Sequence, residues 1–147
     1  MTQYDTVVVG GGPAGYAAAI RCAQLGAKTA IIERHHWGGN SFHHGGVVMA
    51  TLLRHADVAR LLTRDKETFG IRGDVTCDFS VAVSRAHEVS GRMVKGAHFL
   101  LRKYKVTEYQ GEATCLDAHT LKVEFANAAA ESLTCDNLII ATGGLPR

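Results

Sequence analysis

The stretch VVVGGGPAG at positions 7–15 decides how this chain of 147 residues folds. Its three consecutive valines are typical of a strand that is buried on both faces of a parallel sheet. The three glycines that follow predict a tight turn, and Pro13 favours the first turn of a helix, where its missing N–H is not needed. We therefore expect a strand, a glycine turn and a helix over residues 13–25, followed by a second strand over residues 28–32.

The spacing of three glycines and one acidic residue indicates a nucleotide site. Gly10 allows the sharp turn, Gly12 lets a pyrophosphate approach the backbone, and Gly15 lets the helix pack closely on the strand. The helix N-terminus directs its amides and its positive dipole end at phosphate groups. Glu33 ends the second strand about 20 residues after the turn and is placed to accept both ribose hydroxyls. For Arg34 two interpretations stay open, a contact with a 2′-phosphate and a solvated residue at the strand end.

The composition is that of an ordinary globular domain. Hydrophobic residues make up 46% of the chain and charged residues 20%, and the length suffices for one domain with its own core. The formal charge is only +2, with acids and bases interspersed, so nucleic-acid binding has no support. No apolar stretch reaches the length of a membrane span and the N-terminus does not resemble a signal peptide, so we expect no membrane partner and a cytoplasmic protein.

The four cysteines stand far apart, at Cys22, Cys77, Cys115 and Cys135. No CxxC or CxxxxC spacing occurs among them, so the pattern predicts neither a disulfide framework nor a zinc knuckle nor a redox pair. We expect free and mostly buried thiols.

The rest of the sequence predicts helices followed by short strands. A glycine-rich loop is expected at residues 38–46, a helix at 47–69 and a long amphipathic helix at 79–103. An interruption of the long helix at Gly91 or Gly96 stays open. Short strands are expected at 106–109, 113–116, 120–125 and 132–134, and a final buried strand within 137–144 runs into a second glycine turn. The pattern predicts an α/β fold: a Rossmann-like parallel sheet with flanking helices, and a small antiparallel β-meander before the final core strand.

Seven segments together resemble the FAD-binding segment of the pyridine nucleotide-disulphide oxidoreductases, and most of all that of the bacterial dihydrolipoyl dehydrogenases. They are residues 4–16, 23–26, 33, 37–39, 94–100, 105–108 and 139–143. The closing stretch IIATG resembles the family's second flavin-proximal motif. The resemblance covers essentially the whole chain and implies that residues 1–147 are the N-terminal segment of an FAD-binding domain.

The resemblance also implies which residues bind FAD. The glycine turn holds the pyrophosphate, Glu33 holds the adenosine ribose, the backbone at residues 111–113 meets the adenine, and residues 142–143 close over the flavin side. The full predicted set is Gly10, Gly12, Pro13, Ala14, Gly15, Glu33, Arg34, Gly38, Gly39, Asn40, Glu112, Ala113, Ala141, Thr142 and Gly143.

One segment departs from the family. Where the family carries GGTCLNVGCIPSK, residues 38–50 read GGNSFHHGGVVMA. The two redox cysteines fall on Ser41 and Gly46, and the lysine near the flavin falls on Ala50. Dithiol–disulfide exchange requires a thiolate that attacks a sulfur, so we predict no disulfide chemistry and no catalytic residue in this chain.

The family's NAD-binding domain and its dimerisation domain, which carries a His–Glu base, have no counterpart in this sequence. The resemblance therefore implies NAD(H) as a partner only of a complete protein, and a homodimer as the form of such a protein. Two further hypotheses stay open. In the first, the chain is a non-catalytic nucleotide-binding or scaffold module. In the second, its paired histidines, His35-His36 and His43-His44, bind a metal. Adjacent histidines splay apart and no further ligand completes a known spacing, so solvated loop residues are the simpler interpretation and no metal ligand is predicted.

Overall fold

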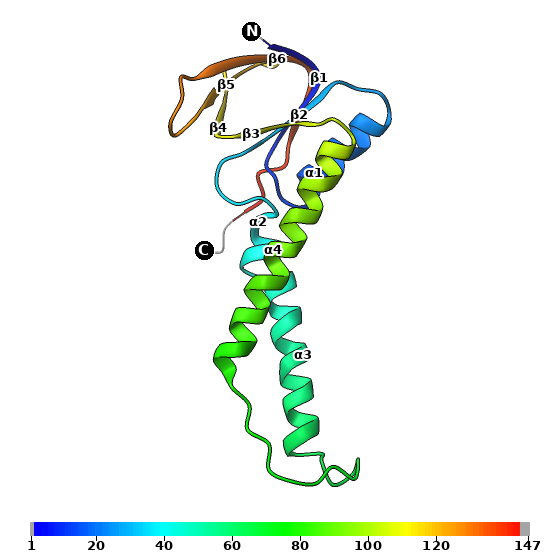
Figure 1. Cartoon of the computed structure of the whole chain (residues 1–147). Coiled ribbons are helices and arrows are strands. Elements are labelled where there is room, and N and C mark those ends of the chain that lie inside the picture. Colours follow the sequence, from blue (N-terminus) through cyan, green and yellow to red (C-terminus); the bar gives the residue numbers. More distant parts are fainter. Residues whose placement is uncertain (1, 145–147) are drawn as a thin grey trace. The chain divides into compact units, whose positions relative to one another are not determined.

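The computed structural model describes residues 2–144, which form a mixed sheet and four helices (Figure 1). The elements are β1 Thr2–Val9, α1 Pro13–Gln24, β2 Thr29–Glu33, α2 Gly39–His43, α3 Gly46–Thr63, α4 Phe79–Lys103, β3 Thr107–Gln110, β4 Glu112–Cys115, β5 Thr120–Glu124 and β6 Glu131–Ile140. The chain divides into two compact units. The first comprises the residues up to Gly39 and those from Val94 onward, and the second comprises residues 40–93.

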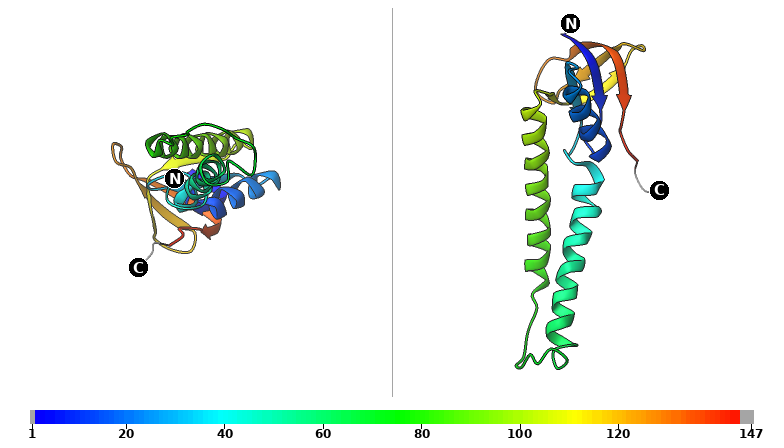
Figure 2. Two further views of the ribbon diagram at one scale, coloured as in Figure 1. Left: turned by 90° about the horizontal axis from the view of Figure 1, so that it is seen from below. Right: turned by 90° about the vertical axis from the view of Figure 1, so that its right-hand side faces the viewer.

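The first unit contains a six-stranded sheet with the strand order β3-β2-β1-β6-β5-β4. The strands β3, β2, β1 and β6 are parallel to one another, whereas β5 and β4 are antiparallel to their neighbours. Val7 on the central strand β1 pairs with Ala30 on one side and with Leu138 on the other. Figure 2 shows β1 and β6 running side by side in the same direction. The predicted fold class, a parallel sheet with an antiparallel extension, is confirmed.

The core of this unit has two sides because side chains alternate along each strand. On one side of β1, Val8 packs with Ile31, with Ala19 of α1 and with Leu101 of α4. On the other side the buried residues come from the strands alone: Tyr4, Val7, Ala30, Ile32, Leu121, Val123, Leu133 and Cys135. The valines at 7 and 8 are both fully buried, which agrees with the expectation for a central parallel strand.

Two predictions about the strands after residue 105 are wrong. Residues 106–109 were expected in the antiparallel meander, but β3 pairs in parallel with β2, with Ala30 opposite Thr107. Residues 132–134 were expected as a separate strand, but they belong to the ten-residue strand β6. The strand is continuous because its pairing with β5, at residues 131–134, overlaps with its pairing with β1, which runs from Leu133 to Ile140.

The second unit consists of α2, α3, and the first part of α4. Figure 1 shows α3 and this part of α4 side by side. The bounds of α4 are as predicted, and the helix continues without a break through Gly91 and Gly96. A glycine inside a helix costs about 1 kcal/mol, and the buried apolar side chains of Ala82, Ala86, Ala97 and Leu101 on α4 offset that cost.

Two further boundaries differ from the prediction. The helix expected to reach residue 69 ends at Thr63, because the chain turns there: Ile71 N donates to Lys66 O at 2.8 Å, and Gly70 adopts a φ of +67°. The loop expected at residues 38–46 contains the short helix α2, whose Phe42 is 5% exposed. No helix in the described part of the chain is long and apolar enough to cross a bilayer.

Candidate functional site

The glycine turn between β1 and α1 leaves no room for side chains at two positions. Gly10 adopts a φ of +111°, and a Cβ there would lie 2.3 Å from the carbonyl oxygen of Ala141. A Cβ at Gly15 would lie 1.7 Å from the carbonyl oxygen of Gly10. The sharp turn and the close approach of the helix to the strand therefore both require glycine.

Gly12 differs from these two glycines because its surroundings are open. A Cβ at Gly12 would meet no described atom within 4 Å. Gly12 is also the N-cap of α1, where its carbonyl accepts the amide of Tyr16 at 3.0 Å, and no side chain caps the helix. Pro13 and Ala14, the first two helical residues, are exposed. The helix N-terminus therefore has no side-chain cap and begins with exposed residues, as an anion site at a helix N-terminus requires.

The Glu33 side chain, at the end of β2, lies against the same turn. Its Oε2 accepts the amide of Gly11 at 2.7 Å, and its Oε1 accepts the amide of His35 at 2.7 Å. A Cβ at Gly11 would lie 2.9 Å from Glu33 Cβ and 2.8 Å from a ring carbon of Trp37. The two amides fix the direction of the carboxylate, and each oxygen retains a lone pair for a further donor.

The loop after β2 returns to the glycine turn. Gly38 N donates to Gly11 O at 2.9 Å, and Gly38 is buried with a φ of +93°. Gly39 has a φ of +54°, and a Cβ there would lie 3.2 Å from Gly12 Cα. Two glycines of this loop thus pack directly on the backbone of the turn.

The start of β4 lies beside the end of β2. Gly111 N donates to Glu33 O at 2.9 Å, which connects the segment predicted to meet the adenine with the residue predicted to hold the ribose. Arg34 Nη1 lies 3.4 Å from Glu112 Oε1, and both side chains are largely exposed. Arg34 therefore lies exposed at the strand end, next to a carboxylate, and both interpretations of its role stay predictions. Ala113 is half-buried.

The segment after β6 completes the arrangement. Ala141 N donates to Val9 O at 2.8 Å, and its side chain lies 3.5 Å from the position of a Cβ on Gly15. Thr142 Cα lies 3.0 Å from the position of a Cβ on Gly10. Thr142 and Gly143 are exposed, and Gly143 adopts a φ of +71°.

The structure therefore places all but one of the predicted cofactor residues in the first unit, around the C-terminal edge of the parallel strands. Asn40 is the exception, since it belongs to the second unit. The positions of the family's cysteines, Ser41 and Gly46, also belong to the second unit and are adjacent there, because a Cβ at Gly46 would lie 3.1 Å from Ser41 O. Ser41, Gly46 and Ala50 are exposed, and none of them can supply a thiol or an amine.

The four cysteines are all free. The prediction that they are mostly buried is wrong: Cys77 and Cys115 are exposed, Cys22 is half-buried, and only Cys135 is buried. Burial raises the pKa of the Cys135 thiol above its ordinary value, which keeps it protonated.

The paired histidines do not form a metal site in the described residues. The rings of His35 and His36 are 6.4 Å apart, and those of His43 and His44 are 6.5 Å apart. No group of three His, Cys, Asp or Glu side chains within residues 2–144 is placed to hold a metal ion.

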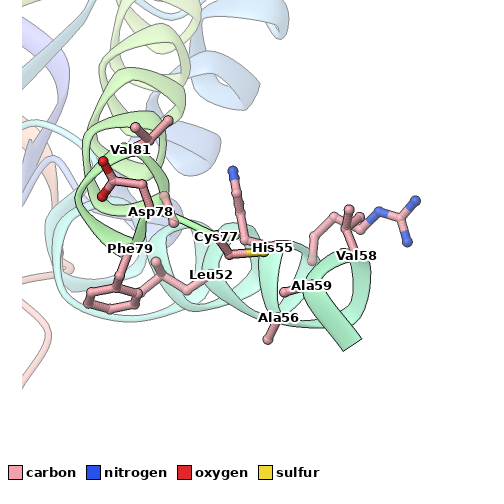
Figure 3. Close-up of a pocket in the computed structure, with 11 residues that line it drawn as sticks. Leu52, His55, Ala56, Val58, Ala59, Cys77, Asp78, Phe79 and Val81 are labelled. Carbon is pink, nitrogen blue, oxygen red and sulfur yellow. The ribbon is translucent and has the colours of Figure 1, made fainter. Parts of the chain in front are cut away.

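The second unit has an apolar cavity of about 520 Å³ between α3 and the start of α4 (Figure 3). It is lined by Leu52, Arg54, His55, Ala56, Val58, Ala59, Cys77, Asp78, Phe79, Val81 and Ala82. Asp78 caps α4, since its Oδ1 accepts the Ser80 amide at 2.8 Å and the Ser80 hydroxyl at 2.7 Å, and these bonds hold its pKa below the ordinary value. The cavity contains no residue of the predicted cofactor site.

Sequence reasoning did not single out Gln110, the last residue of β3, although its side chain bonds to the loop that carries Glu33. A glutamine at a strand end carries no recognisable pattern. Only the pairing of β3 with β2 brings it to the site.

Comparison with known proteins defines the class. The family model of the pyridine nucleotide-disulphide oxidoreductases matches residues 4–147, and this chain belongs to that family. Among its relatives are the dihydrolipoyl dehydrogenases of Mycobacterium tuberculosis, 48% identical over 147 residues, and of Corynebacterium glutamicum, 44% identical over 146 residues. These alignments cover 100% and 99% of this chain but only 32% and 31% of the relatives, so the chain spans about a third of their length.

A solved structure supports the fold alone. The Cu(II) complex of the HOCl-induced flavoprotein disulfide reductase RclA from Escherichia coli superposes with a TM-score of 0.80. The two sequences are 23% identical, and the match covers 99% of this chain and 30% of the other.

Proposed function

We propose that this chain binds FAD and is the FAD-binding segment of a flavoprotein oxidoreductase similar to dihydrolipoyl dehydrogenase. The observation that carries the proposal is the open, uncapped N-terminus of α1 at Gly12, with the Glu33 carboxylate fixed beside the same turn. Membership of the family and 48% identity to a dihydrolipoyl dehydrogenase favour FAD over other dinucleotides.

The pyrophosphate of FAD fits the first turn of α1. Its negative charge is stabilised by the free amides and by the positive end of the helix dipole, a contribution of about 0.3–1 kcal/mol for an exposed site. The missing side chain at Gly12 leaves space for the phosphate oxygens, while Gly10 and Gly15 give the turn its shape.

The adenosine half fits the end of β2. The Glu33 carboxylate accepts the two ribose hydroxyls, and the backbone around Glu112 and Ala113 lies next to it through the bond from Gly111 N to Glu33 O. The isoalloxazine half is directed toward Ala141, Thr142 and Gly143, with Gly38, Gly39 and Asn40 on the neighbouring loop. When bound, the flavin accepts and donates hydride, and the protein supplies binding and orientation.

The chemistry of the complete protein does not include disulfide exchange at the family's position. Ser41 and Gly46 replace the two cysteines, and neither a hydroxyl nor a hydrogen atom can attack or leave as a thiolate does. We propose that residues 1–147 form the N-terminal segment of the FAD domain, that NAD(H) is the hydride partner of the complete protein, and that the complete protein is a homodimer.

The same replacements favour a second candidate, a nucleotide-binding module without catalysis. Both candidates bind FAD, but only the first passes hydride to it. Reduction of the bound flavin by NADH in the complete protein distinguishes them, because it bleaches the visible flavin absorption.

The visible spectrum of the purified chain tests the proposal. We expect that the chain, incubated with FAD and then desalted, retains the absorption of a bound oxidised flavin. An apoprotein with native circular dichroism that retains no flavin and shows no saturable FAD titration would contradict it.

A further inference from the structure

The side chain of Gln110 forms three hydrogen bonds with one short loop. Its Nε2 donates to Glu33 O at 3.0 Å and to His35 O at 3.3 Å, and its Oε1 accepts Trp37 Nε1 at 2.6 Å. All three partners lie within residues 33–37, which lead from β2 toward the glycines at 38 and 39. We refer to Gln110 and these three bonds as the Gln110 clamp.

Trp37 extends the clamp to the glycine turn. Its ring lies next to Gly11, where a Cβ would be 2.8 Å from the ring carbon Cε3. Its centroid is 5.1 Å from that of His98, and the ring also packs against the buried cluster around Val8 and Ile31. The bond to Gln110 therefore fixes the edge of a ring that is already held by the core.

The clamp acts on the main chain of the residue whose side chain faces the nucleotide. Glu33 O accepts both Gln110 Nε2 and Gly111 N, so the ends of β2 and β3 are joined by a side-chain bond and a main-chain bond at the same atom. At the other end of the residue, the Glu33 carboxylate accepts the amides of Gly11 and His35. Gln110 holds His35 as well, through its carbonyl.

We propose that Gln110 is a positioning residue for the adenosine half of the nucleotide. It sets the Glu33 carboxylate and the segment 111–113 at a fixed distance from each other, so that the ribose and the adenine are bound without a prior rearrangement of the loop. Preorganisation of this kind increases affinity because the entropy of ordering the loop is lost on folding and not on binding. The inference rests on the proposed nucleotide site.

The test uses the single tryptophan of the chain as its reporter. Gln110→Met keeps the length of the side chain and removes all three bonds, whereas Gln110→Glu keeps the acceptor for Trp37 and removes both donors. Gln24→Met, an exposed glutamine at the end of α1, is the matched control. Fluorescence of Trp37 is recorded without nucleotide, and FAD and ADP are then titrated separately. ADP carries the adenosine and the pyrophosphate but no flavin.

We expect Gln110→Met to shift the Trp37 emission to longer wavelength and to increase its quenching by acrylamide. We expect its affinities for FAD and for ADP to fall about 10-fold, corresponding to the loss of one to two hydrogen bonds. Gln110→Glu should lose similar affinity with a smaller change in emission, and Gln24→Met should match the wild type in every measurement.

Trp37→Phe separates positioning from general destabilisation. It keeps an aromatic ring and removes Nε1, so in combination with Gln110→Met it should cost no more affinity than the larger of the two single substitutions. Additive losses would overturn the clamp, as would unchanged Trp37 emission or unchanged FAD and ADP affinity in Gln110→Met. A wild-type protein that binds neither FAD nor ADP, while Gln110→Met still shifts the emission, would overturn the proposed function and leave the clamp as a purely structural bond. If Gln110→Met fails to fold, Gln110→Glu provides the Trp37 emission and the two affinities, and Trp37→Phe, which has no tryptophan, provides the FAD affinity measured by flavin fluorescence.

Discussion

The carboxylate of Glu33 accepts the amide of Gly11 at 2.7 Å, across 22 positions of the chain. This bond joins the end of β2 to the turn after β1, so the two parts of the proposed site that bind ribose and pyrophosphate do not move independently. The second oxygen, held by His35 N at 2.7 Å, stops the carboxylate from rotating away.

Replacement of this carboxylate should weaken nucleotide binding. Glu33→Gln retains one oxygen acceptor and loses the negative charge, and hydrogen bonds to charged groups contribute about 1.5–3 kcal/mol. We expect FAD affinity to fall roughly 10- to 100-fold in a titration followed by flavin fluorescence. Glu124→Gln, which changes an exposed carboxylate on β5, is the control and should bind FAD as the wild type does. Equal affinity in Glu33→Gln would show that Glu33 does not contact the ribose.

Gly12→Ala should abolish nucleotide binding without harm to the fold. A Cβ at Gly12 meets no described atom within 4 Å, and the φ of −73° suits any residue. Removal of a glycine also restricts the unfolded chain, which stabilises the fold by about 0.4–1 kcal/mol. Alanine is a poorer N-cap than glycine, which offsets this gain, so we expect a thermal midpoint close to that of the wild type. The new methyl group would occupy the space of a phosphate oxygen, so we expect no saturable FAD titration. Retained FAD affinity in this variant would remove the turn from the site.

Gly15→Ala, in contrast, should destabilise the fold, and it serves as the comparison for Gly12→Ala. Its Cβ would lie 1.7 Å from the carbonyl oxygen of Gly10, a backbone atom that can move only if β1 and α1 separate. Overpacking of this kind costs about 3 kcal/mol or more, or roughly 10 °C in the thermal midpoint of a chain of this size. Circular dichroism melts of the two variants, compared with the wild type, check the contrast. A midpoint of Gly15→Ala equal to that of Gly12→Ala would contradict the packing described for the turn.

The part of the fold that could be predicted from sequence is the part specified by local pattern. The run Val7-Val8-Val9 before three glycines defines β1 and its turn without knowledge of any distant residue. The periodicity of α4 defines a helix of 25 residues to its last residue, because one apolar face is maintained throughout.

The errors concern features that depend on partners far away in the sequence. The four residues of β3 have no property that distinguishes a parallel edge strand from a meander strand. Only their pairing with β2, with Ala30 opposite Thr107, makes β3 a parallel edge strand. The continuity of β6 likewise follows from its two neighbours, β1 and β5. The Gln110 clamp could not be predicted for the same reason, since it depends on the register that places Gln110 opposite Glu33.

Alkaline pH should destabilise the first unit through Tyr109. Its hydroxyl lies 2.9 Å from that of Tyr4, and burial, followed by this bond, raises its pKa above the ordinary value of 10.0. The unfolded chain therefore releases this proton at lower pH than the folded chain does. The contribution of Tyr109 to the free energy of unfolding is fully present below pH 10. Above pH 10 the free energy of unfolding falls by up to about 1.4 kcal/mol per pH unit.

Urea unfolding at several pH values between neutral and about 11 measures this effect. Tyr109→Phe should be about 1 kcal/mol less stable at neutral pH, from the lost hydrogen bond, but should lose less stability on going to alkaline pH. Tyr104→Phe, a half-buried tyrosine outside this pair, is the control. If the free energy of unfolding depends on pH in the same way for the wild type and Tyr109→Phe, then Tyr109 has the same pKa in the folded and unfolded chains.

Thiol modification should distinguish two cysteines that come from the same sheet. Cys115 on β4 is exposed, whereas Cys135 on β6 is 3% exposed and its pKa is raised, first of all by burial. Because the thiolate is the reactive species, a raised pKa and a closed environment both slow the reaction of Cys135. At slightly alkaline pH we expect an aromatic disulfide reagent to label Cys77 and Cys115 first, Cys22 more slowly, and Cys135 only when the fold opens. Peptide mapping over time gives the order, and urea should abolish the difference. Labelling of Cys135 as fast as Cys115 in the native protein would show that Cys135 is not buried in the core of the sheet as described.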